Sequence, residues 1–464
     1  MVNQRLRAAV VRIAKTADHE TSSLLEKSLK PLLASASAIY RGLSFTRRFL
    51  YNYGLLEATR LPVPVVSVGN ITWGGNGKTP MVETLSGWFL GAGICPLILT
   101  RGYAGGDEAQ MLQMHLQGSC AKLGVGPNRA NIARSFLQSH GMQSYQHRKK
   151  LGESLSLESA GTSSQLWMKG DGKIGVVILD DGMQHLPLAR NLEIVMVNAI
   201  TLWGNTRMVP RGPLRESLHQ LKRADVLVLH HADLVAEESL DSTETMLKQF
   251  LRKDAIVICS SMIPLHLFGL PSLEAEIGSL RRTPEHSRLP LNTLRDSVVL
   301  SVSGVGCPEA LSLALERDLQ DIDMRCLELQ MRFEGRTVVI VLTEKDYVRD
   351  PLIWRIVTNA QVLILHSSLK LISTGKTLAA LRKLLTAVVS CDVTKGSGGS
   401  CGHQTHTTDV IKALHEEQKG GIRHWVLYLM EGAQDQKGSQ ETDLEQEVQT
   451  TSGGDFIWQS LPAQ

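Results

Sequence analysis

Short apolar runs alternate with stretches of helical periodicity from about residue 63 onward. The runs contain few polar positions, which is typical of strands buried on both faces of a sheet. We predict strands at 64–69, 95–100, 174–181, 193–198, 226–231, 256–260, 298–304, 338–346 and 362–366. Strands of this kind separated by helices predict an α/β fold with a mainly parallel sheet flanked by helices.

The first sixty residues follow a different pattern. Apolar side chains between residues 22 and 56 recur at helical spacing, and basic residues lie between them. The apolar positions are Leu25, Leu29, Leu32, Leu33, Ala36, Ile39, Tyr40 and Leu43, and the basic ones are Lys27, Lys30, Arg41, Arg47 and Arg48. Such a helix either lies on an anionic membrane surface, apolar face down, or packs on the domain behind it.

Two polar segments interrupt the alternation of strands and helices. Residues 144–173 are predicted to be a surface insertion, and from about residue 395 the chain becomes rich in Gln, Glu and Gly. We therefore divide the chain into a candidate targeting presequence at 1–20, an amphipathic helix at 21–60, a core domain at 61–235, a second domain at 236–394 and a poorly ordered tail at 395–464.

Composition narrows the class of protein. The 464 residues are 43% hydrophobic and 20% charged, as in an ordinary soluble α/β protein. The net charge of +3 is too small to indicate a nucleic-acid partner. The seven cysteines form no Cys-x-x-Cys pair, which predicts reduced thiols and neither a disulfide framework nor a zinc site. No apolar stretch is long enough to predict a transmembrane helix.

The amino end is basic. Arg5, Arg7, Arg12 and Lys15 all precede the first acidic residue, Asp18. This is the composition of an organelle-targeting presequence, and an ordinary basic helix start explains it equally well.

Residues 69–79, GNITWGGNGKT, form a candidate phosphate loop. The glycines lie between a predicted strand and a predicted helix, so that backbone N–H groups and the helix dipole face an anion. The spacing departs from the usual Gly-x4-Gly-Lys-Ser/Thr because position 72 is threonine. We expect Lys78 to reach the outer phosphates and the Thr79 hydroxyl to bind Mg²⁺. The alternative is a glycine-rich turn that contains a lysine.

Carboxylates follow two of the predicted strands. Asp180 and Asp181 end an apolar run, at the edge where α/β sheets place ligands, and His185 follows closely. Asp107 and Glu108 follow another strand and a glycine-rich turn. A carboxylate there deprotonates a hydroxyl or supports a metal ion. The structural alternatives are a turn residue and a solvated loop.

A basic cluster follows the fourth predicted strand. It comprises Arg207, Arg211, Arg215, Lys222 and Arg223. Such a cluster neutralises a phosphate or forms a solvated helix face.

Taken in order, these motifs resemble the tetraacyldisaccharide 4′-kinase family of lipid A synthesis. Residues 62–80 match the family's phosphate loop, PVPVxxVGNxxxGGxGKTP, including its unusual spacing. Further matching blocks are LTRGYAGGDE, DDGMQH, NLEIVMVNA, GNTRMVPRGPLRESLHQLKRADVLVLHH, SGVGCPEAL and TEKDYV. The resemblance runs from about residue 25 to residue 385.

The resemblance implies transfer of the γ-phosphate of ATP to the 4′-hydroxyl of an acylated glucosamine disaccharide 1-phosphate, with Mg²⁺. It also implies a P-loop NTPase-type fold of two Rossmann-like lobes, with an amino-terminal helix in peripheral contact with the membrane. The implied nucleotide contacts are Gly69, Asn70, Gly74, Gly75, Asn76, Gly77, Lys78, Thr79, His185 and Lys345. The implied metal side is Thr79, Glu108, Asp180 and Asp181, and the implied catalytic residues are Asp107 as the base, Lys78 and the phosphate contact Arg215.

One family feature is missing from this chain. In the family, the base works with a histidine from an Asp-His-His stretch between the SGVG and TEKD blocks. The join between those blocks is shorter here, with a segment missing near residues 320–335, and it contains no histidine. Losing half of a general-base pair costs about 10²–10⁴ in rate. We therefore expect ATP to bind and turnover to be weak or absent.

Other features of the sequence bear on the location of the protein, and two other functions remain as alternatives. The short loop after RGY, the basic extension and the long tail suggest an organellar, plant-like homologue on the mitochondrial inner membrane. The alternative location is the cytoplasmic face of a bacterial inner membrane. The rival functions are a P-loop NTPase that assists maturation of a partner and a catalytically silent nucleotide-binding scaffold.

Overall fold

The computed structural model describes residues 2–15, 23–102, 106–157, 171–270, 288–295, 297–302, 326, 329–333, 337–349, 351, 353–355, 357, 360–392 and 457–460. The chain divides into two compact units. The first comprises Met1–Arg101, Gly118–Ser261 and Leu369–Ile422, and the second comprises Gly102–Gln117, Met262–Ser368 and Arg423–Gln464.

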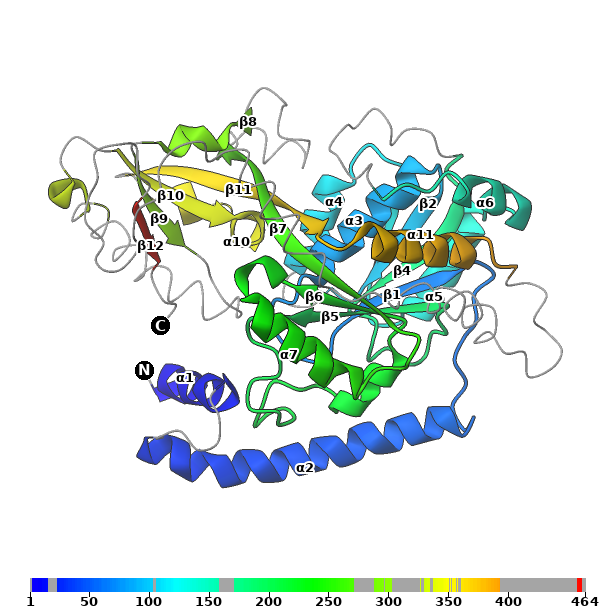
Figure 1. Cartoon of the computed structure of the whole chain (residues 1–464), viewed down its shortest axis with the longest axis horizontal. Coiled ribbons are helices and arrows are strands. Elements are labelled where there is room, and N and C mark those ends of the chain that lie inside the picture. The colour runs from blue at the N-terminus through cyan, green and yellow to red at the C-terminus, as the bar shows by residue number, and fades with distance from the viewer. Residues whose placement is uncertain are drawn as a thin grey trace. The chain divides into compact units, whose positions relative to one another are not determined.

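A parallel sheet forms the centre of the first unit (Figure 1). Its strands are β1 (Val65–Gly69), β2 (Cys95–Thr100), β3 (Lys122–Val125), β4 (Ile174–Asp180), β5 (Leu192–Asn198), β6 (Val226–His230) and the first part of β7 (Ile256–Gly269). They lie in the order β7-β6-β5-β1-β4-β2-β3, and every pair is parallel. The predicted mainly parallel α/β fold is confirmed.

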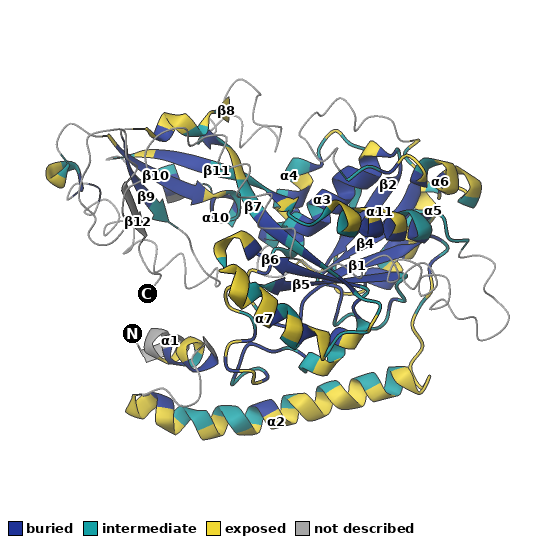
Figure 2. Ribbon diagram, in the orientation of Figure 1, coloured by how far each residue is buried: buried dark blue, intermediate teal, exposed yellow. Residues whose placement is uncertain are grey.

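Helices surround this sheet. They are α1 (Val2–Lys15), α2 (Leu24–Asn52), α3 (Lys78–Gly91), α5 (Arg129–His140), α6 (Tyr145–Gly152), α7 (Glu237–Lys248) and α11 (Gly375–Val389), with short 3-10 turns η2 (Leu218–Arg223) and η3 (Ala232–Leu234). Every residue of β1, β2, β4 and β6 is buried, as Figure 2 shows in dark blue. Full burial explains why these strands contain apolar runs instead of alternating polar and apolar positions.

The segment predicted to be a surface insertion begins with a packed helix. Arg148 of α6 is buried, and its guanidinium donates to the backbone oxygens of Gln143 (2.6 Å), Val389 (3.3 Å) and Cys391 (3.2 Å). These bonds join α6 to the end of α11. A charged side chain that satisfies backbone carbonyls at the end of a helix looks, in the sequence, like any exposed arginine.

α2 contacts other parts of the first unit through several of its side chains. Its start is fixed by a capping box, in which Ser23 and Glu26 bond to each other's backbone N–H groups (3.4 and 3.2 Å). Ser37 donates to the Met208 oxygen (2.8 Å), and the Tyr40 hydroxyl donates to the Arg215 oxygen (3.1 Å). Packing on the neighbouring domain, one of the two alternatives for this helix, therefore occurs.

α1 packs through its second half. The side chain of Asn205 donates to the Ile13 oxygen (2.7 Å), and Ala9 and Ile13 are buried. Among the helices that the structure describes, none has both the length and the apolar composition needed to cross a membrane.

The second unit contains the remaining strands, most of which pair in parallel. Its elements are α4 (Asp107–His115), the rest of β7, β8 (Arg288–Leu289), η5 (Leu291–Leu294), β9 (Ser297–Val302), β10 (Thr337–Thr343), α10 (Glu344–Arg349), η6 (Ile353–Arg355), most of β11 (Gln361–Leu371) and β12 (Ile457–Ser460). β10 pairs with β9 and β11, and β12 pairs with β9, all in parallel. β8 pairs with β7 antiparallel. Val298, Ile340 and Ile364 form the centre of one core cluster.

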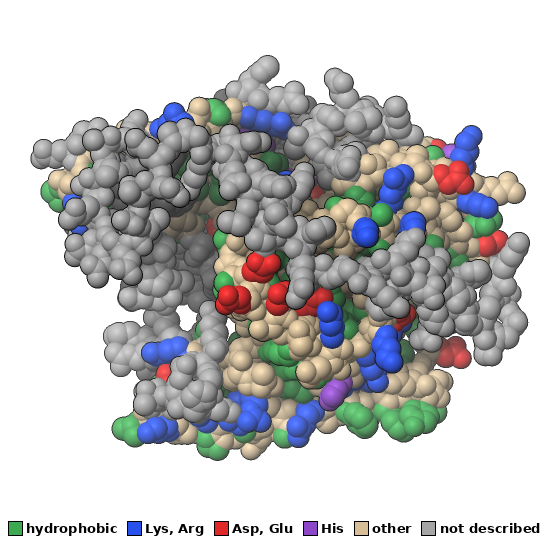
Figure 3. Space-filling model, in the orientation of Figure 1, with side chains coloured by type: hydrophobic (Ala, Val, Ile, Leu, Met, Phe, Trp, Pro, Cys, Tyr) green, Lys and Arg blue, Asp and Glu red, His purple; other side chains and the backbone are tan. Residues whose placement is uncertain are grey.

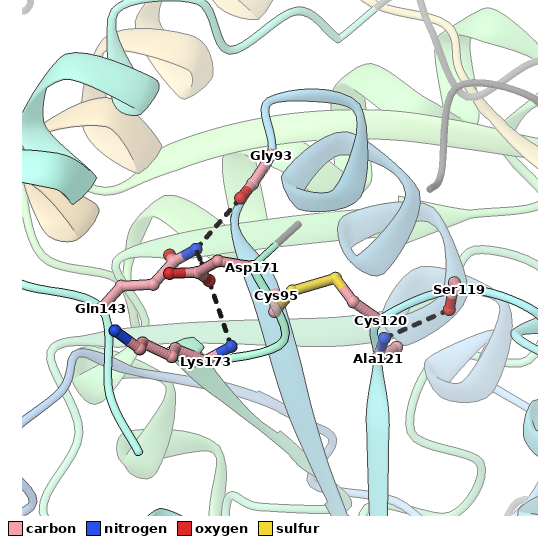
Figure 4. Close-up of a disulfide and its surroundings, with 8 residues drawn as sticks. All are labelled: Gly93, Cys95, Ser119, Cys120, Ala121, Gln143, Asp171 and Lys173. Atoms are coloured by element: carbon pink, nitrogen blue, oxygen red, sulfur yellow. Dashed lines mark hydrogen bonds between the residues drawn. A yellow bond between two sulfur atoms is a disulfide. The ribbon is translucent and has the colours of Figure 1, made fainter. Parts of the chain in front are cut away.

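A disulfide joins two cysteines of the first unit, which corrects the prediction of reduced thiols (Figure 4). Cys95 opens β2, and Cys120 lies just before β3; their Cα atoms are 5.6 Å apart. Because β2 and β3 pair in parallel, residues 25 positions apart in sequence become neighbours. Spacing along the chain could not reveal this pairing, since it arises from the sheet topology.

Replacing Cys120 with serine is expected to lower the free energy of unfolding by about 2–4 kcal/mol under oxidising conditions, because the opened loop regains freedom in the unfolded chain. Urea denaturation measures this change. Wild-type protein treated with a thiol reductant should match the variant, and Cys391→Ser, which removes an unpaired thiol, should not change stability. Equal stability of oxidised wild-type protein and Cys120→Ser would contradict the prediction.

Candidate active site

The predicted phosphate loop connects the end of β1 to the start of α3. Gly74 and Gly77 have φ angles of +98° and +73°, in the left-handed region that favours glycine. The side chain of Asn76 fastens the loop by donating to Thr72 Oγ1 (3.0 Å) and to the Gly74 oxygen (3.3 Å). Among the described residues, no side chain caps the amino end of α3. Its first N–H groups and the helix dipole therefore favour an anion at this position.

The ring of the buried residue His230 packs against the loop at Gly77. A Cβ atom added to Gly77 would lie 2.6 Å from the Cδ2 and Nε2 atoms of His230. The His230 ring also bonds to Ser260 Oγ (3.0 Å). Burial, with a smaller contribution from His231, lowers the pKa of His230 to about 3, so the ring is neutral at pH 7. A neutral ring supports the loop without repelling the loop's lysine.

Gly77→Ala is expected to lower nucleotide affinity by at least about tenfold, because a left-handed alanine costs about 1–2 kcal/mol and its methyl group displaces His230. Gly87→Ala, within α3 and outside the loop, is the matched control, since Gly87 has open space around its Cα and no positive φ. Isothermal titration with ATP measures both variants. Equal affinities of the two variants would contradict the role assigned to Gly77.

Asn70 offers polar atoms inside this loop. Its side chain is fully buried, and neither its Oδ1 nor its Nδ2 has a hydrogen-bond partner among the described residues. Its backbone oxygen accepts from Gln184 Nε2 (2.8 Å). A buried amide without a partner costs about 1–3 kcal/mol. Its Nδ2 is a donor of the kind that a phosphate oxygen accepts, and the nucleotide contact of Asn70 stays a prediction.

The paired aspartates lie beside the loop. Asp180 is buried and pairs in register with Val68 of β1, which places it next to the strand that carries the loop. Arg215 Nη1 donates to both carboxylate oxygens of Asp181 (2.8 Å each), and Lys78 Nζ lies 3.6 Å from Oδ1. Burial opposes ionisation of Asp181, but the charges of Lys78 and Arg215 outweigh it and lower its pKa.

The loop also positions Arg215. The backbone N–H of Arg215 donates to the Ile71 oxygen (2.6 Å), and Thr72 pairs antiparallel with Leu214. Within the predicted basic cluster, Arg223 has a different role, because it pairs with Glu216 (3.1 Å). That pair is mostly buried, so Arg223 stabilises the folded structure.

Sequence reasoning missed one residue that holds the aspartate turn. Arg129, at the start of α5, is buried and donates to the backbone oxygens of Asp180 (2.9 Å) and Asp181 (3.1 Å). An arginine in a helical segment gives no signal in a single sequence. Asp181 itself has a φ of +51°, a conformation that these bonds help to hold.

His185 lies at the end of the same turn. Its backbone N–H donates to the Gly182 oxygen (2.8 Å), and its buried Nε2 has no partner among the described residues. Burial, with the charges of Arg129 and Arg190, lowers the pKa of His185 to about 4. The ring is therefore neutral at pH 7 and offers one hydrogen bond to a ligand, which fits the predicted nucleotide contact.

The oxygen atoms near the loop fit a magnesium ion. Thr79 is buried in the first turn of α3, and Asp180 ends the strand next to β1. Hydroxyl and carboxylate oxygens are the protein ligands that Mg²⁺ prefers. Asp181 follows Asp180 directly and is paired with Lys78 and Arg215.

The predicted acidic pair belongs to the second unit. Asp107 and Glu108 begin α4, after Gly106 with a φ of +78°. Arg349 Nη2 lies 3.3 Å from Asp107 Oδ2, and Lys345 Nζ lies 2.7 Å from Glu108 Oε1. Lys345, expected at the nucleotide, is thus placed with Glu108. The join where the family's histidine would lie is largely outside the described residues.

The family model of tetraacyldisaccharide-1-P 4′-kinase matches residues 29–386. The chain belongs to this family. A relative named "probable tetraacyldisaccharide 4′-kinase, mitochondrial", from Arabidopsis thaliana, is 41% identical over 391 residues, which cover 79% of this chain and 93% of the relative. The tetraacyldisaccharide 4′-kinase of Desulfotalea psychrophila is 30% identical over 68% of this chain and 86% of its own length. A crystal structure of LpxK from Aquifex aeolicus in complex with ATP aligns with a TM-score of 0.46 and 22% identity, covering 79% of this chain and 100% of that chain.

Proposed function

We propose that this kinase family member transfers the γ-phosphate of ATP to the 4′-hydroxyl of a tetraacyldisaccharide 1-phosphate, giving lipid IVA in lipid A synthesis. The observation that carries the proposal is the loop between β1 and α3, where Lys78 contacts Asp181 (3.6 Å) and the helix start has no side-chain cap among the described residues. The family match supplies the acceptor class.

In the reaction, the 4′-oxygen attacks the γ-phosphorus, the bond to the β–γ bridging oxygen breaks, and ADP leaves. The loop amides and Lys78 bind the outer phosphates and take up the charge that develops on them. Asp181 holds Lys78 and Arg215 in place before the nucleotide arrives. Asp107 accepts the proton of the 4′-hydroxyl.

Magnesium, when bound, neutralises phosphate charge and orients the transferring group. Thr79, Asp180 and Asp181 would hold it.

Phosphate transfer from γ-labelled ATP tests the proposal against its rivals. The purified chain is incubated with Mg²⁺, labelled ATP and the lipid disaccharide 1-phosphate, and the label is located by chromatography. A kinase labels the lipid, an NTPase releases free phosphate, and a scaffold does neither. Label in free phosphate alone, with unlabelled lipid, would overturn the kinase proposal.

The exposed face of α2 supports peripheral membrane contact. Leu32, Ile39 and Leu43 are 66–67% exposed, and Figure 3 shows hydrophobic and basic side chains along this helix at the lower edge of the view. Apolar side chains beside basic ones match an anionic bilayer surface.

Replacing Leu32, Ile39 and Leu43 together with serine is expected to weaken binding to anionic phospholipid vesicles by at least about tenfold, because about 1.5–3 kcal/mol is lost for each fully buried leucine-sized side chain. Vesicle co-sedimentation measures the change. Leu234→Ser, at an equally exposed leucine of the same unit, is the matched control. Unchanged binding of the triple variant would contradict a membrane role for this face.

We also propose a mitochondrial location, with the chain peripheral on the inner membrane. The basic amino end and the name of the Arabidopsis thaliana relative support it. Fractionation of organelles from cells that express the full chain tests this location. Recovery outside mitochondria would overturn it.

A further inference from the structure

A second group of polar side chains lies in the second unit and takes no part in the proposed phosphate transfer. It consists of His115 at the end of α4, Glu344 at the start of α10 and His366 on β11. His115 Nε2 lies 3.0 Å from Glu344 Oε1, and His366 Nδ1 lies 2.9 Å from the same oxygen. The three ligand atoms all lie within 4.8 Å of one another. Two imidazole nitrogens and one carboxylate oxygen are therefore close enough together to bind one ion.

The group is largely shielded from water. The side chains of His115, Glu344 and His366 are 11%, 11% and 15% exposed. Burial opposes ionisation of Glu344, but hydrogen bonds with the two histidines outweigh it and lower the pKa of Glu344 to about 2. The cluster thus places one carboxylate between two imidazoles in a mostly buried part of the second unit.

A third imidazole lies beside this group. The ring of His266, on β7, is centred 4.8 Å from the ring of His366. Burial, with the charge of His366, lowers the pKa of His266 to about 4. Imidazole is the commonest metal ligand in proteins, so His266 offers a further donor beside the group.

We propose that His115, Glu344 and His366 form a binding site for a divalent transition-metal ion of the Zn²⁺ type, with His266 or water in the fourth position. Two imidazoles and one carboxylate form a donor set that zinc accepts in tetrahedral sites. Magnesium prefers oxygen ligands, so this site differs in metal class from the oxygen ligands near Thr79.

The bound ion would act through α4 and α10. These helices are already joined by the pairs Arg349–Asp107 (3.3 Å) and Lys345–Glu108 (2.7 Å). An ion held by His115 and Glu344 adds a third link between the same helices and ties them to β11. The site would therefore position the acidic pair without contacting substrate.

The test uses the full chain after treatment with a chelator. Zn²⁺ is titrated by calorimetry in the presence of excess Mg²⁺, and Co²⁺ is added to a second sample as a spectroscopic probe. X-ray absorption of the zinc-loaded chain identifies the atoms that bind the zinc ion. The variants are His115→Ala, Glu344→Gln and His366→Ala, and the control is His147→Ala, an exposed histidine of α6. Far-UV circular dichroism checks that each variant folds.

We expect one Zn²⁺ per chain, a tetrahedral Co²⁺ spectrum and a first shell of nitrogen and oxygen that includes two or three imidazoles. Each folded cluster variant should bind Zn²⁺ at least about 100-fold more weakly, since even outer-shell changes cost 10–100-fold. The control should bind like the wild type. Absence of binding by the wild-type chain, sulfur in the first shell, or unchanged affinity in the cluster variants would each overturn the proposal. If a variant fails to fold, the absorption spectrum of the wild-type chain still decides.

Discussion

Replacing Lys78 with alanine is expected to lower kcat/KM for phosphate transfer by at least about 10²–10³-fold, the usual cost of losing one group that stabilises transition-state charge. Lys78 lies at the start of α3 with its Nζ 3.6 Å from Asp181, so its charge is held where the outer phosphates are expected. Arg215 continues to pair with Asp181 in the variant, so the turn should keep its shape. Steady-state kinetics with labelled ATP measures the loss.

A matched variant separates this effect from a general loss of positive charge. Lys222 belongs to the same unit and is exposed, and Lys222→Ala should leave both nucleotide affinity and turnover unchanged. The free energy of unfolding of both variants should stay close to that of the wild type. If Lys78→Ala keeps full nucleotide affinity and full turnover, the phosphate-site assignment is refuted.

Insertion of a family-type segment that carries Asp-His-His between Arg325 and Val338 is expected to raise kcat by about 10²–10⁴-fold, the usual contribution of general acid–base catalysis. In the described structure, Asp107 is paired with Arg349 (3.3 Å). An imidazole partner would relay the proton that Asp107 takes from the sugar hydroxyl. Single-turnover assays with the lipid disaccharide measure the gain.

The control for this experiment is the same inserted segment with its histidines changed to alanine. It restores the length of the join without the imidazoles, so it should leave turnover near the level of the original chain. If the histidine-bearing segment also leaves turnover unchanged, the missing stretch does not limit turnover. ATP affinity should be the same in all three chains, because the phosphate loop is untouched.

Burial made the central strands easy to predict from the sequence. β2 was predicted at its observed bounds, because Cys95–Thr100 is fully buried and therefore apolar throughout. β10 ends three residues earlier than predicted. Thr343 and Asp346 bond to each other (2.7 and 3.3 Å), which starts α10 at Glu344. β3 was missed, because only one of its four residues is buried.

Local motifs also predicted much of the phosphate site. Lys78, Asp181 and Arg215 do come together, since each follows a recognisable strand or family block. Contacts between distant segments could not be predicted. His115 and Glu344 are 229 positions apart, and only the packing of α4 on α10 makes them neighbours.

The disulfide also bears on the behaviour of the chain before it is fully folded. Among the strands that the structure describes, β3 is the last at one end of the first unit's sheet, and none of them pairs with its outer backbone groups. Unpaired edges of this kind act as templates for association between chains. The covalent link from Cys120 to Cys95 limits separation of this short edge strand from β2. The cross-link would thus guard against intermolecular strand pairing as well as add stability.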